Sequence, residues 1–297
     1  MHFGTSLAGL ESLVPSEAEL TRLWTGGTWT EGPVWIAERS AVRWSDIPGD
    51  RILEYSVASG ESSVYAEGVE FTNGRILDLD RAVIQCSHGL RRVELDAGGE
   101  VTALVDRFEG RRLNSPNDVV VSKDGSVWFT DPTYGIINAN EGHLGSQEYG
   151  GCFVFRFDRS SGELTAVITD MEQPNGLAFN PDESTLYVSD SSAAHHNIRA
   201  YPVSGTEIGP GRVFAEIESG ASDGFRVDTE GNLWTSSADA ILVFDPDGTR
   251  LGRIPIPEVI SNLCFGGADG RDLFITATTS LYHLPTLARD ASTLWRS

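Results

Sequence analysis

The sequence predicts an all-β protein, a six-bladed β-propeller with four-stranded blades. One pattern recurs: a polar residue, usually followed by glycine, leads a short apolar strand, a turn and a second apolar strand. Residues 115–131 show it clearly, because Asp124-Gly125 lies between two runs of β-forming residues. A repeat of roughly 40–50 residues built from short strands is typical of a propeller, and six copies predict six blades. The leading residues, 39 to 58 positions apart, are Glu31, Asn73, Asn117, Asn175, Asp223 and Asn262.

The N-terminal part of the chain contains a strand that has no earlier blade to join. Residues 19–24 resemble residues 163–168, which are expected to form the outermost strand of a blade just before the next blade begins. We therefore expect residues 19–24 to complete the last blade, whose other strands come from about residues 261–288. This arrangement closes the ring and removes a free sheet edge. Residues 1–18 are then an N-terminal extension, and residues 19–297 form a single propeller domain.

The composition limits the partners and the compartment. The formal net charge of −21 argues against nucleic acid or an anionic membrane surface as a partner. The sequence does not open with a basic segment followed by an apolar run, so we expect no signal peptide, no membrane span and a cytoplasmic location. Cys86, Cys152 and Cys264 form no CxxC motif, and we expect buried free thiols. Nothing in the sequence indicates an oligomeric state.

The third repeat carries an insertion over residues 134–151. This stretch is polar and rich in glycine, and it shows no strand alternation. Insertions in repeat proteins map to loops on one face, which is often the binding face. We expect this segment to form a lid or a wall of the substrate site, with a plain surface loop as the alternative.

The six leading residues occupy one equivalent position in each blade. The first strand of a propeller blade lines the central channel, so these side chains are expected to form one ring. All of them supply oxygen, and converging carboxylates and amides would repel one another unless a cation lay between them. Ca²⁺ takes 6–8 oxygen ligands, whereas Zn²⁺ usually takes His and Cys. Asn73-Gly74 alone also fits an ordinary turn, but Glu31 is not a turn residue and Asn117 is followed by Asp118.

Five motifs carry a family resemblance. They are Glu31-Gly32-Pro33, Ser115-Pro116-Asn117-Asp118, Phe129-Thr130-Asp131-Pro132, Pro174-Asn175-Gly176 and Ser222-Asp223-Gly224. Together they resemble the gluconolactonase / senescence-marker-protein-30 / luciferin-regenerating-enzyme family over about residues 19–285.

The resemblance implies a propeller hydrolase with one catalytic divalent metal in the channel. The implied metal is Ca²⁺, with Mg²⁺, Mn²⁺ or Zn²⁺ as alternatives. Asn73 and Asn262 are placed behind the metal ligands or in the substrate pocket. Ser115 stands where the vertebrate branch of the family carries Arg, so the sugar contacts are expected to differ. The implied metal ligands are Glu31, Asn117, Asn175 and Asp223.

The implied reaction is hydrolysis of a sugar lactone, with glucono-1,5-lactone giving gluconate. A lactone is a cyclic ester, so a metal can polarise its carbonyl and stabilise the oxyanion while water attacks. Asp223 is the expected catalytic base, as a metal ligand with one carboxylate oxygen left free. We expect no acyl-enzyme.

Three further residues are candidates for substrate binding. Tyr134 begins the insertion. His88 follows the second strand of the second blade and either reaches a substrate hydroxyl or lies in a solvated loop. His195 lies in a loop after the second strand of the fourth blade, either as a contact at the rim or as part of the surface.

Two other functions stay open. The same metal site would also serve a hydrolase of phosphotriesters or of another lactone, because both reactions need the same Lewis acid. A non-catalytic propeller with a structural calcium ion is the third hypothesis. The ring of polar residues inside the channel argues against it, since a structural plug could be apolar.

Overall fold

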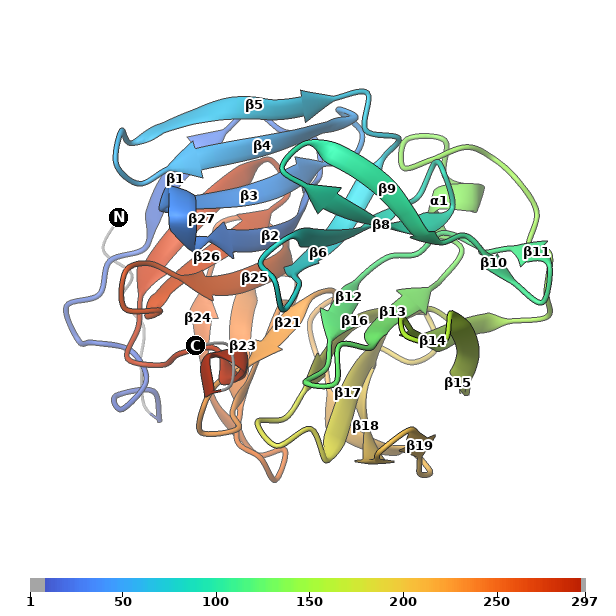
Figure 1. The fold of residues 1–297 in the computed structure, drawn as a ribbon. Helices are drawn as coiled ribbons and strands as arrows, with labels where there is room; N and C mark the ends of the chain where they lie inside the picture. Colours follow the sequence, from blue (N-terminus) through green and yellow to red (C-terminus); the bar gives the residue numbers. More distant parts are fainter. Residues whose placement is uncertain (1–8, 295–297) are drawn as a thin grey trace.

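A computed structural model describes residues 9–294 and confirms the six-bladed propeller (Figure 1). The first blade contains β2 (Thr30–Ile36), β3 (Ala41–Asp46), β4 (Arg51–Ser56) and β5 (Glu61–Glu67). The second contains β6 (Thr72–Leu77), β7 (Val83–Ser87), β8 (Arg92–Ala97) and β9 (Glu100–Val105). The third contains β12 (Val119–Val121), β13 (Val127–Asp131), β14 (Cys152–Asp158) and β15 (Glu163–Met171).

The remaining blades follow the same order. The fourth contains β16 (Pro174–Phe179), β17 (Thr185–Asp190), β18 (Asn197–Ser204) and β20 (Arg212–Glu216), with β19 (Glu207–Ile208) also paired to β18. The fifth contains β21 (Phe225–Val227), β22 (Leu233–Thr235), β23 (Ala240–Phe244) and β24 (Arg250–Pro255). The sixth contains β25 (Ile260–Gly266), β26 (Asp272–Ala277), β27 (Ser280–Pro285) and β1 (Thr21–Thr25).

Few elements lie outside the blades in the described part of the chain. A small hairpin joins β10 (Arg107–Phe108) to β11 (Arg111–Arg112). One helical turn, α1 (Tyr134–Ile137), begins the insertion, and 3₁₀ turns cover Ala37–Arg39 and Ala291–Leu294.

The innermost strand of every blade faces the central channel. Each of these strands contacts the innermost strands of the two neighbouring blades, in the cyclic order β2, β6, β12, β16, β21, β25. The ring closes as the sequence predicts, because β1 pairs antiparallel with β27, with Thr21 opposite His283. Strands from both ends of the chain therefore form one sheet (Figure 1).

The predicted extension partly packs on the ring. Residues 1–8 lie outside the described part of the chain. Leu10 and Val14 are 0% and 2% exposed and pack in a cluster with Ile254 of β24 and Leu284 of β27. Its described residues, 9–18, thus contribute apolar side chains to the last two blades and form no strand of their own.

Three tryptophans on second strands fill the spaces between blades. Trp44, Trp128 and Trp234 are at most 2% exposed. Trp44 packs with Phe274 of the sixth blade, and Trp128 packs with Leu177 of the fourth. Burying a side chain of this size stabilises the fold by several kcal/mol, of the order of the 3–5 kcal/mol that truncating a buried aromatic to alanine costs. The sides of the blades thus form the core and leave the channel to polar residues.

The three cysteines are as the sequence predicts. Cys86, Cys152 and Cys264 are buried free thiols. No helix among residues 9–294 has the length and apolar character needed to cross a membrane.

Candidate active site

A cavity of about 260 Å³ lies at one end of the central channel. It is found where the innermost strands begin, because each leading polar residue lies within the first three positions of its strand or within two residues before it. The predicted ring is therefore largely present. Five of its six members line this one cavity: Glu31, Asn73, Asn117, Asn175 and Asp223.

Irregularities in the innermost strands turn these side chains toward the channel. In β2, β6 and β16 the pairing with the second strand shifts register at or beside the leading residue. A bulge of this kind bends a strand and redirects a side chain. The shifts lie between Glu31 and Val34, between Thr72 and Arg75, and between Pro174 and Leu177.

The glycine after a leading residue allows two innermost strands to approach closely. The Gly74 N–H donates to the Asn117 carbonyl at 2.9 Å, and a Cβ on Gly74 would lie 2.5 Å from that same oxygen. Gly176 has the same relation to the Asp223 carbonyl, with a hydrogen bond of 3.0 Å. Asn73-Gly74 therefore lies inside strand β6 and does not form the ordinary turn that its dipeptide allows.

Glu31 is a buried carboxylate with one oxygen left without a partner. The side chain belongs to a residue that is 3% exposed. Its Oε2 accepts hydrogen bonds from the Gly32 N–H (2.5 Å) and the Asn262 amide (3.0 Å). Its Oε1 is buried and has no hydrogen-bond partner among the described residues. Burial, followed by the charge of Asp118, raises the pKa of Glu31 to about 7.

Asp223 lies in the same electrostatic environment. Burial raises its pKa well above the usual range, the charges of Glu31 and Asp118 raise it further, and a hydrogen bond with Asn175 offsets part of the effect. Asp118 itself is 1% exposed, and burial raises its pKa as well. Three acidic side chains thus share one poorly solvated region, which disfavours their ionised forms.

These residues fit a hard divalent cation. The donors are carboxylate and amide oxygens, which Ca²⁺ prefers, and the unpartnered Glu31 Oε1 is a free ligand atom. A positive charge here would also relieve the repulsion between Glu31 and Asp223. Residues 9–294 contain no group of three or more His, Cys, Asp and Glu side chains arranged to hold a metal. A site here depends on the amides of Asn117 and Asn175.

The insertion supplies part of the cavity wall, in agreement with the sequence expectation. Tyr134, in its first helical turn, and Glu141 both line the cavity, together with Ser191 from the fourth blade. The Asn138 amide donates to Glu141 Oε1 at 2.7 Å, and burial raises the pKa of this carboxyl group.

His88 lies behind the cavity wall and does not line the cavity. It is fully buried, and its Nδ1 lies 3.0 Å from the Glu141 carbonyl oxygen, so this nitrogen carries the proton and donates. Its Nε2 then accepts from the Asn73 amide at 3.2 Å. Burial is the main cause that lowers the pKa of His88 to about 4. His88 thus connects a cavity residue to the insertion as a neutral imidazole.

The other two substrate candidates also lie away from the cavity lining. His195 is exposed in the loop between β17 and β18. Asn262 is 2% exposed and lies behind Glu31, to which it donates. Its Oδ1 accepts from the Leu263 N–H at 2.8 Å, so both ends of the amide are held by the protein.

A serine next to Asp223 lies in a sequence motif typical of nucleophilic serines, but it does not lie in the turn that such a serine needs. Residues 220–224 read Gly-Ala-Ser-Asp-Gly, which matches Gly-x-Ser-x-Gly. Ser222 is fully buried, its hydroxyl lies 2.7 Å from Thr235 Oγ1, and it precedes strand β21. The strand-to-helix turn of a nucleophile elbow is therefore absent here, and the geometry does not support an acyl-enzyme.

Sequence reasoning missed three charged residues around the channel. Asp118 follows Asn117 at the position where four of the other five repeats carry glycine, and this departure was its signal. Arg226 lies in the short buried strand β21, and a charged residue in such a strand could have marked it as a candidate. Glu141 gave no signal, because the folded path of the insertion brings it to the cavity.

The fold and the site define a six-bladed propeller with an oxygen-lined cavity in its channel. Residues 29–279 match the model of the SMP-30/Gluconolactonase/LRE-like region. The chain therefore belongs to this family, as its motifs predict.

Individual relatives extend over most of the chain. A gluconolactonase from Zymomonas mobilis is 33% identical over 283 residues, covering 87% of this chain and 78% of that protein. A pentonolactonase from Haloferax volcanii is 29% identical and covers 83% and 80%, respectively. The solved structure of a gluconolactonase from Xanthomonas campestris superposes with a TM-score of 0.90 at 38% identity, covering 94% of this chain and 92% of that one. A luciferin-regenerating enzyme, at 16% identity and a TM-score of 0.77, shares the fold.

Proposed function

We propose that this protein is a divalent-cation-dependent lactonase that opens a sugar lactone, with glucono-1,5-lactone as the first substrate to test. The gluconolactonase and pentonolactonase relatives support the reaction class. The observation that carries the cation dependence is the buried, unpartnered Glu31 Oε1 beside Asp223 in the channel cavity. A buried ionised group without a partner is costly, and a cation would compensate it.

The four residues that would hold the cation are Glu31, Asn117, Asn175 and Asp223, which all line the cavity. When bound, a divalent cation supplies a Lewis acid that stabilises the negative charge developing on the lactone carbonyl oxygen. The Asn262 amide fixes the orientation of Glu31 through its hydrogen bond to Oε2. Metal sites commonly need residues like this one, which hydrogen-bond to a ligand side chain and fix its orientation.

Asp223 acts as the general base in this proposal. Water forms the new bond to the carbonyl carbon, and its proton passes to the Asp223 carboxylate. The ring C–O bond then breaks, and the same proton goes to the departing alkoxide, so the products are the hydroxy acid and a regenerated Asp223. A carboxylate that also binds a cation is a weak base, so Asp223 would rely on the bound cation to acidify the attacking water as well.

The cavity wall favours a polyhydroxylated substrate over a neutral phosphotriester. Asn73, Tyr134, Glu141 and Ser191 add amide, hydroxyl and carboxyl groups to a wall that also contains the apolar side chains of Trp29, Ile47, Val259 and Ile260. These groups can pair with sugar hydroxyls, whereas a phosphotriester offers no donor to them and would leave them desolvated.

The test is hydrolysis of glucono-1,5-lactone followed by pH-stat, with the spontaneous rate subtracted. Activity should be lost with chelator, return with Ca²⁺, Mg²⁺, Mn²⁺ or Zn²⁺, and fall by about 10²-fold or more in Asp223→Ala. Asp239→Ala is the matched control, because Asp239 is an exposed aspartate that pairs with Arg253 at the surface. Turnover that persists in chelator, or in Asp223→Ala, would overturn the proposal. If a cation binds but no lactone is hydrolysed, the proposed cation site is supported and the proposed substrate is wrong.

A further inference from the structure

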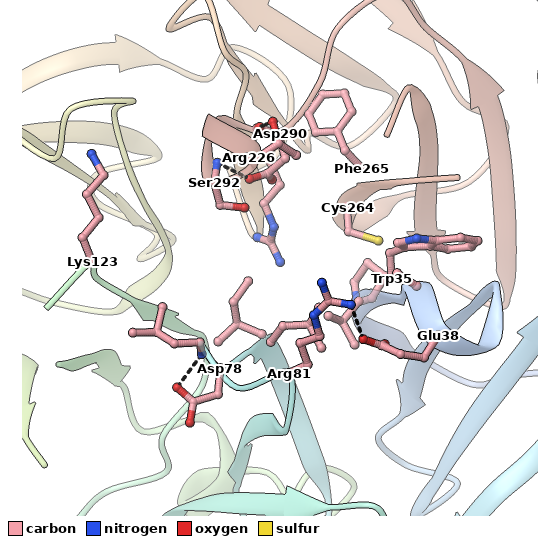
Figure 2. Close-up of a pocket in the computed structure, with 17 residues that line it drawn as sticks. Trp35, Glu38, Asp78, Arg81, Lys123, Arg226, Cys264, Phe265, Asp290 and Ser292 are labelled. Atoms are coloured by element: carbon pink, nitrogen blue, oxygen red, sulfur yellow. Dashed lines mark hydrogen bonds and ion pairs between the residues drawn. The ribbon is translucent and has the colours of Figure 1, made fainter. Parts of the chain in front are cut away.

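A second, larger cavity of about 560 Å³ opens at the opposite end of the channel. It is lined by residues from the later positions of the innermost strands, including Trp35 of β2, Ile76 of β6 and Phe265 of β25. Residues at the beginnings of the same strands, Glu31, Asn73 and Ile260, line the first cavity, so the two cavities lie at opposite ends of these strands. We call this second space the rear cavity (Figure 2).

The wall of the rear cavity is largely apolar and aromatic. Trp35 is partly exposed and stacks on Phe274, with ring centroids 5.5 Å apart and an interplanar angle of 7°. Phe265 is held by an edge-to-face contact with Trp234 at 5.6 Å. These rings are fixed by packing, so they offer a preformed surface to a flat or aliphatic group.

Arg226 places a buried positive charge in this apolar surrounding. The residue is 5% exposed and lines the rear cavity. Its Nη1 donates to the adjacent Phe225 carbonyl at 2.7 Å, and its Nη2 is buried without a hydrogen-bond partner. No described carboxylate forms an ion pair with it. Buried guanidinium groups are normally paired, because an unsatisfied charged donor is strongly unfavourable.

The carboxylates that line the rear cavity have other partners. Glu38 pairs with Arg81 at 2.6 Å, and Asp78 pairs with Arg159. Asp290 accepts from the backbone N–H at position 292 at 2.8 Å. Figure 2 shows the Arg226 and Arg81 guanidinium groups directed toward the middle of the cavity from opposite sides. Lys123 also lines the cavity, and its Nζ donates to the Pro181 carbonyl at 3.0 Å. Arg226 is therefore the buried cation of this cavity that keeps an unused donor for a bound anion.

Arg226 also acts on the acidic residues of the channel, but only from a distance. Burial raises the pKa values of Glu31 and Asp118, and the charge of Arg226 lowers them in part. Neither carboxylate forms an ion pair or a hydrogen bond with the guanidinium group. Even if Arg226 serves as a counter-ion to these two carboxylates, its Nη2 donor still has no hydrogen-bond partner.

We propose that the rear cavity binds a small monocarboxylate with an apolar body, whose carboxylate pairs with Arg226 and whose ring or chain packs against Trp35 and Phe265. A planar guanidinium group suits the two oxygens of a carboxylate. The lining holds as many carboxylates (Glu38, Asp78 and Asp290) as basic side chains (Arg81, Lys123 and Arg226), so it has no excess of positive charge that would favour phosphate or a polyanion over a single carboxylate. This site is separate from the proposed catalytic cavity and does not depend on its activity.

The test uses 4-fluorobenzoate as the probe and follows it by ¹⁹F NMR with chelator present, so that no divalent cation can recruit it to the other cavity. Binding should saturate with a Kd of about 1 mM or tighter. It should weaken at least tenfold in Arg226→Gln and in Leu79→Asp, which adds a repelling carboxylate at a lining residue that is 47% exposed. The uncharged 4-fluorobenzyl alcohol should bind at least tenfold more weakly.

The controls separate this site from the rest of the molecule. Arg253→Gln removes an exposed arginine that pairs with Asp239 and should leave binding unchanged, and Asp223→Ala should do the same. If Arg226→Gln fails to fold, as judged by circular dichroism, Leu79→Asp decides the question. The proposal would be overturned if Leu79→Asp bound the probe as the wild type does, or if Asp223→Ala lost binding. It would also be overturned if inorganic phosphate displaced the probe at a lower concentration than benzoate does.

Discussion

Lowering the pH should destabilise the protein through His88, and the effect can be isolated with one conservative variant. The imidazole is fully buried, and its pKa is lowered from 6.5 to about 4. Between these values the unfolded chain binds a proton that the folded chain excludes, so the free energy of unfolding falls as the pH falls from about 6.5 to about 4. A shift of this size corresponds to about 3 kcal/mol. Above pH 6.5 the contribution is fully present.

His88→Gln removes the titrating group and keeps both hydrogen bonds. A glutamine amide can donate to the Glu141 carbonyl and accept from Asn73, as His88 does. We expect the variant to be less stable than the wild type at pH 7 by about 1–2 kcal/mol, the usual cost of a buried substitution. Between pH 6.5 and pH 4 the variant should gain about 3 kcal/mol relative to the wild type.

The assay is urea unfolding followed by tryptophan fluorescence at half-unit pH steps, in chelator. The buried carboxylates oppose His88, because their raised pKa values favour the folded state as the pH falls. Their contribution is common to both proteins and cancels in the difference. A stability difference that stays constant within about 0.5 kcal/mol from pH 7 to pH 4 would refute the buried neutral imidazole. An NMR titration of His88 with a midpoint near 6.5 would refute it independently.

Three further predictions concern the channel cavity. Gly176→Ala should lower the free energy of unfolding by about 2–3 kcal/mol in urea, because a Cβ would overlap the Asp223 carbonyl. Asn262→Ala should weaken Ca²⁺ binding by about 10-fold or more in calorimetry, because it frees the orientation of Glu31. Ca²⁺ at 100 times its Kd should stabilise the wild type by about 2.7 kcal/mol, and Glu31→Gln should remove most of this gain in a thermal melt.

Each of these predictions has a control. Gly150→Ala should be nearly neutral, because no atom lies within 4 Å of the added Cβ. A similar loss in both glycine variants would contradict the close-approach argument. Asn262→Ala should leave the fold intact by circular dichroism, and Ca²⁺ affinity equal to that of the wild type would exclude a positioning role. Equal Ca²⁺ stabilisation of the wild type and Glu31→Gln would place the cation elsewhere.

The repeat pattern was sufficient to predict the blades, because alternation and turn residues are local properties. The ring of leading residues followed from the same register, and five of its members share one cavity. Asn262 has the equivalent position in its repeat, but its amide is already hydrogen-bonded to Glu31 and to the Leu263 N–H. A repeat register therefore predicts which strand position faces the channel, and hydrogen bonding decides which side chain is left free.

The residues that the sequence could not place depend on contacts between distant segments. Glu141 reaches the cavity because the insertion folds back over the channel, and no local pattern encodes that path. His88 and His195 follow equivalent second strands, but one lies under the insertion and the other lies in an exposed loop. Burial by a non-repeating segment thus breaks the equivalence of the blades and separates the roles of similar residues.

The pairing of β1 with β27 has a consequence for how the molecule is made. Thr21 near the start of the chain lies opposite His283 near its end. The hydrogen bond between Asn262 and Glu31 likewise joins distant positions, which are 231 residues apart. Such long-range contacts form late, since a large loop must close before they can stabilise anything. During synthesis the first five blades can stack in turn, but Glu31 gains its amide partner only when the sixth blade has emerged. Completion of the proposed cation site and loss of the free sheet edges should therefore be one event, so that cation binding would report ring closure.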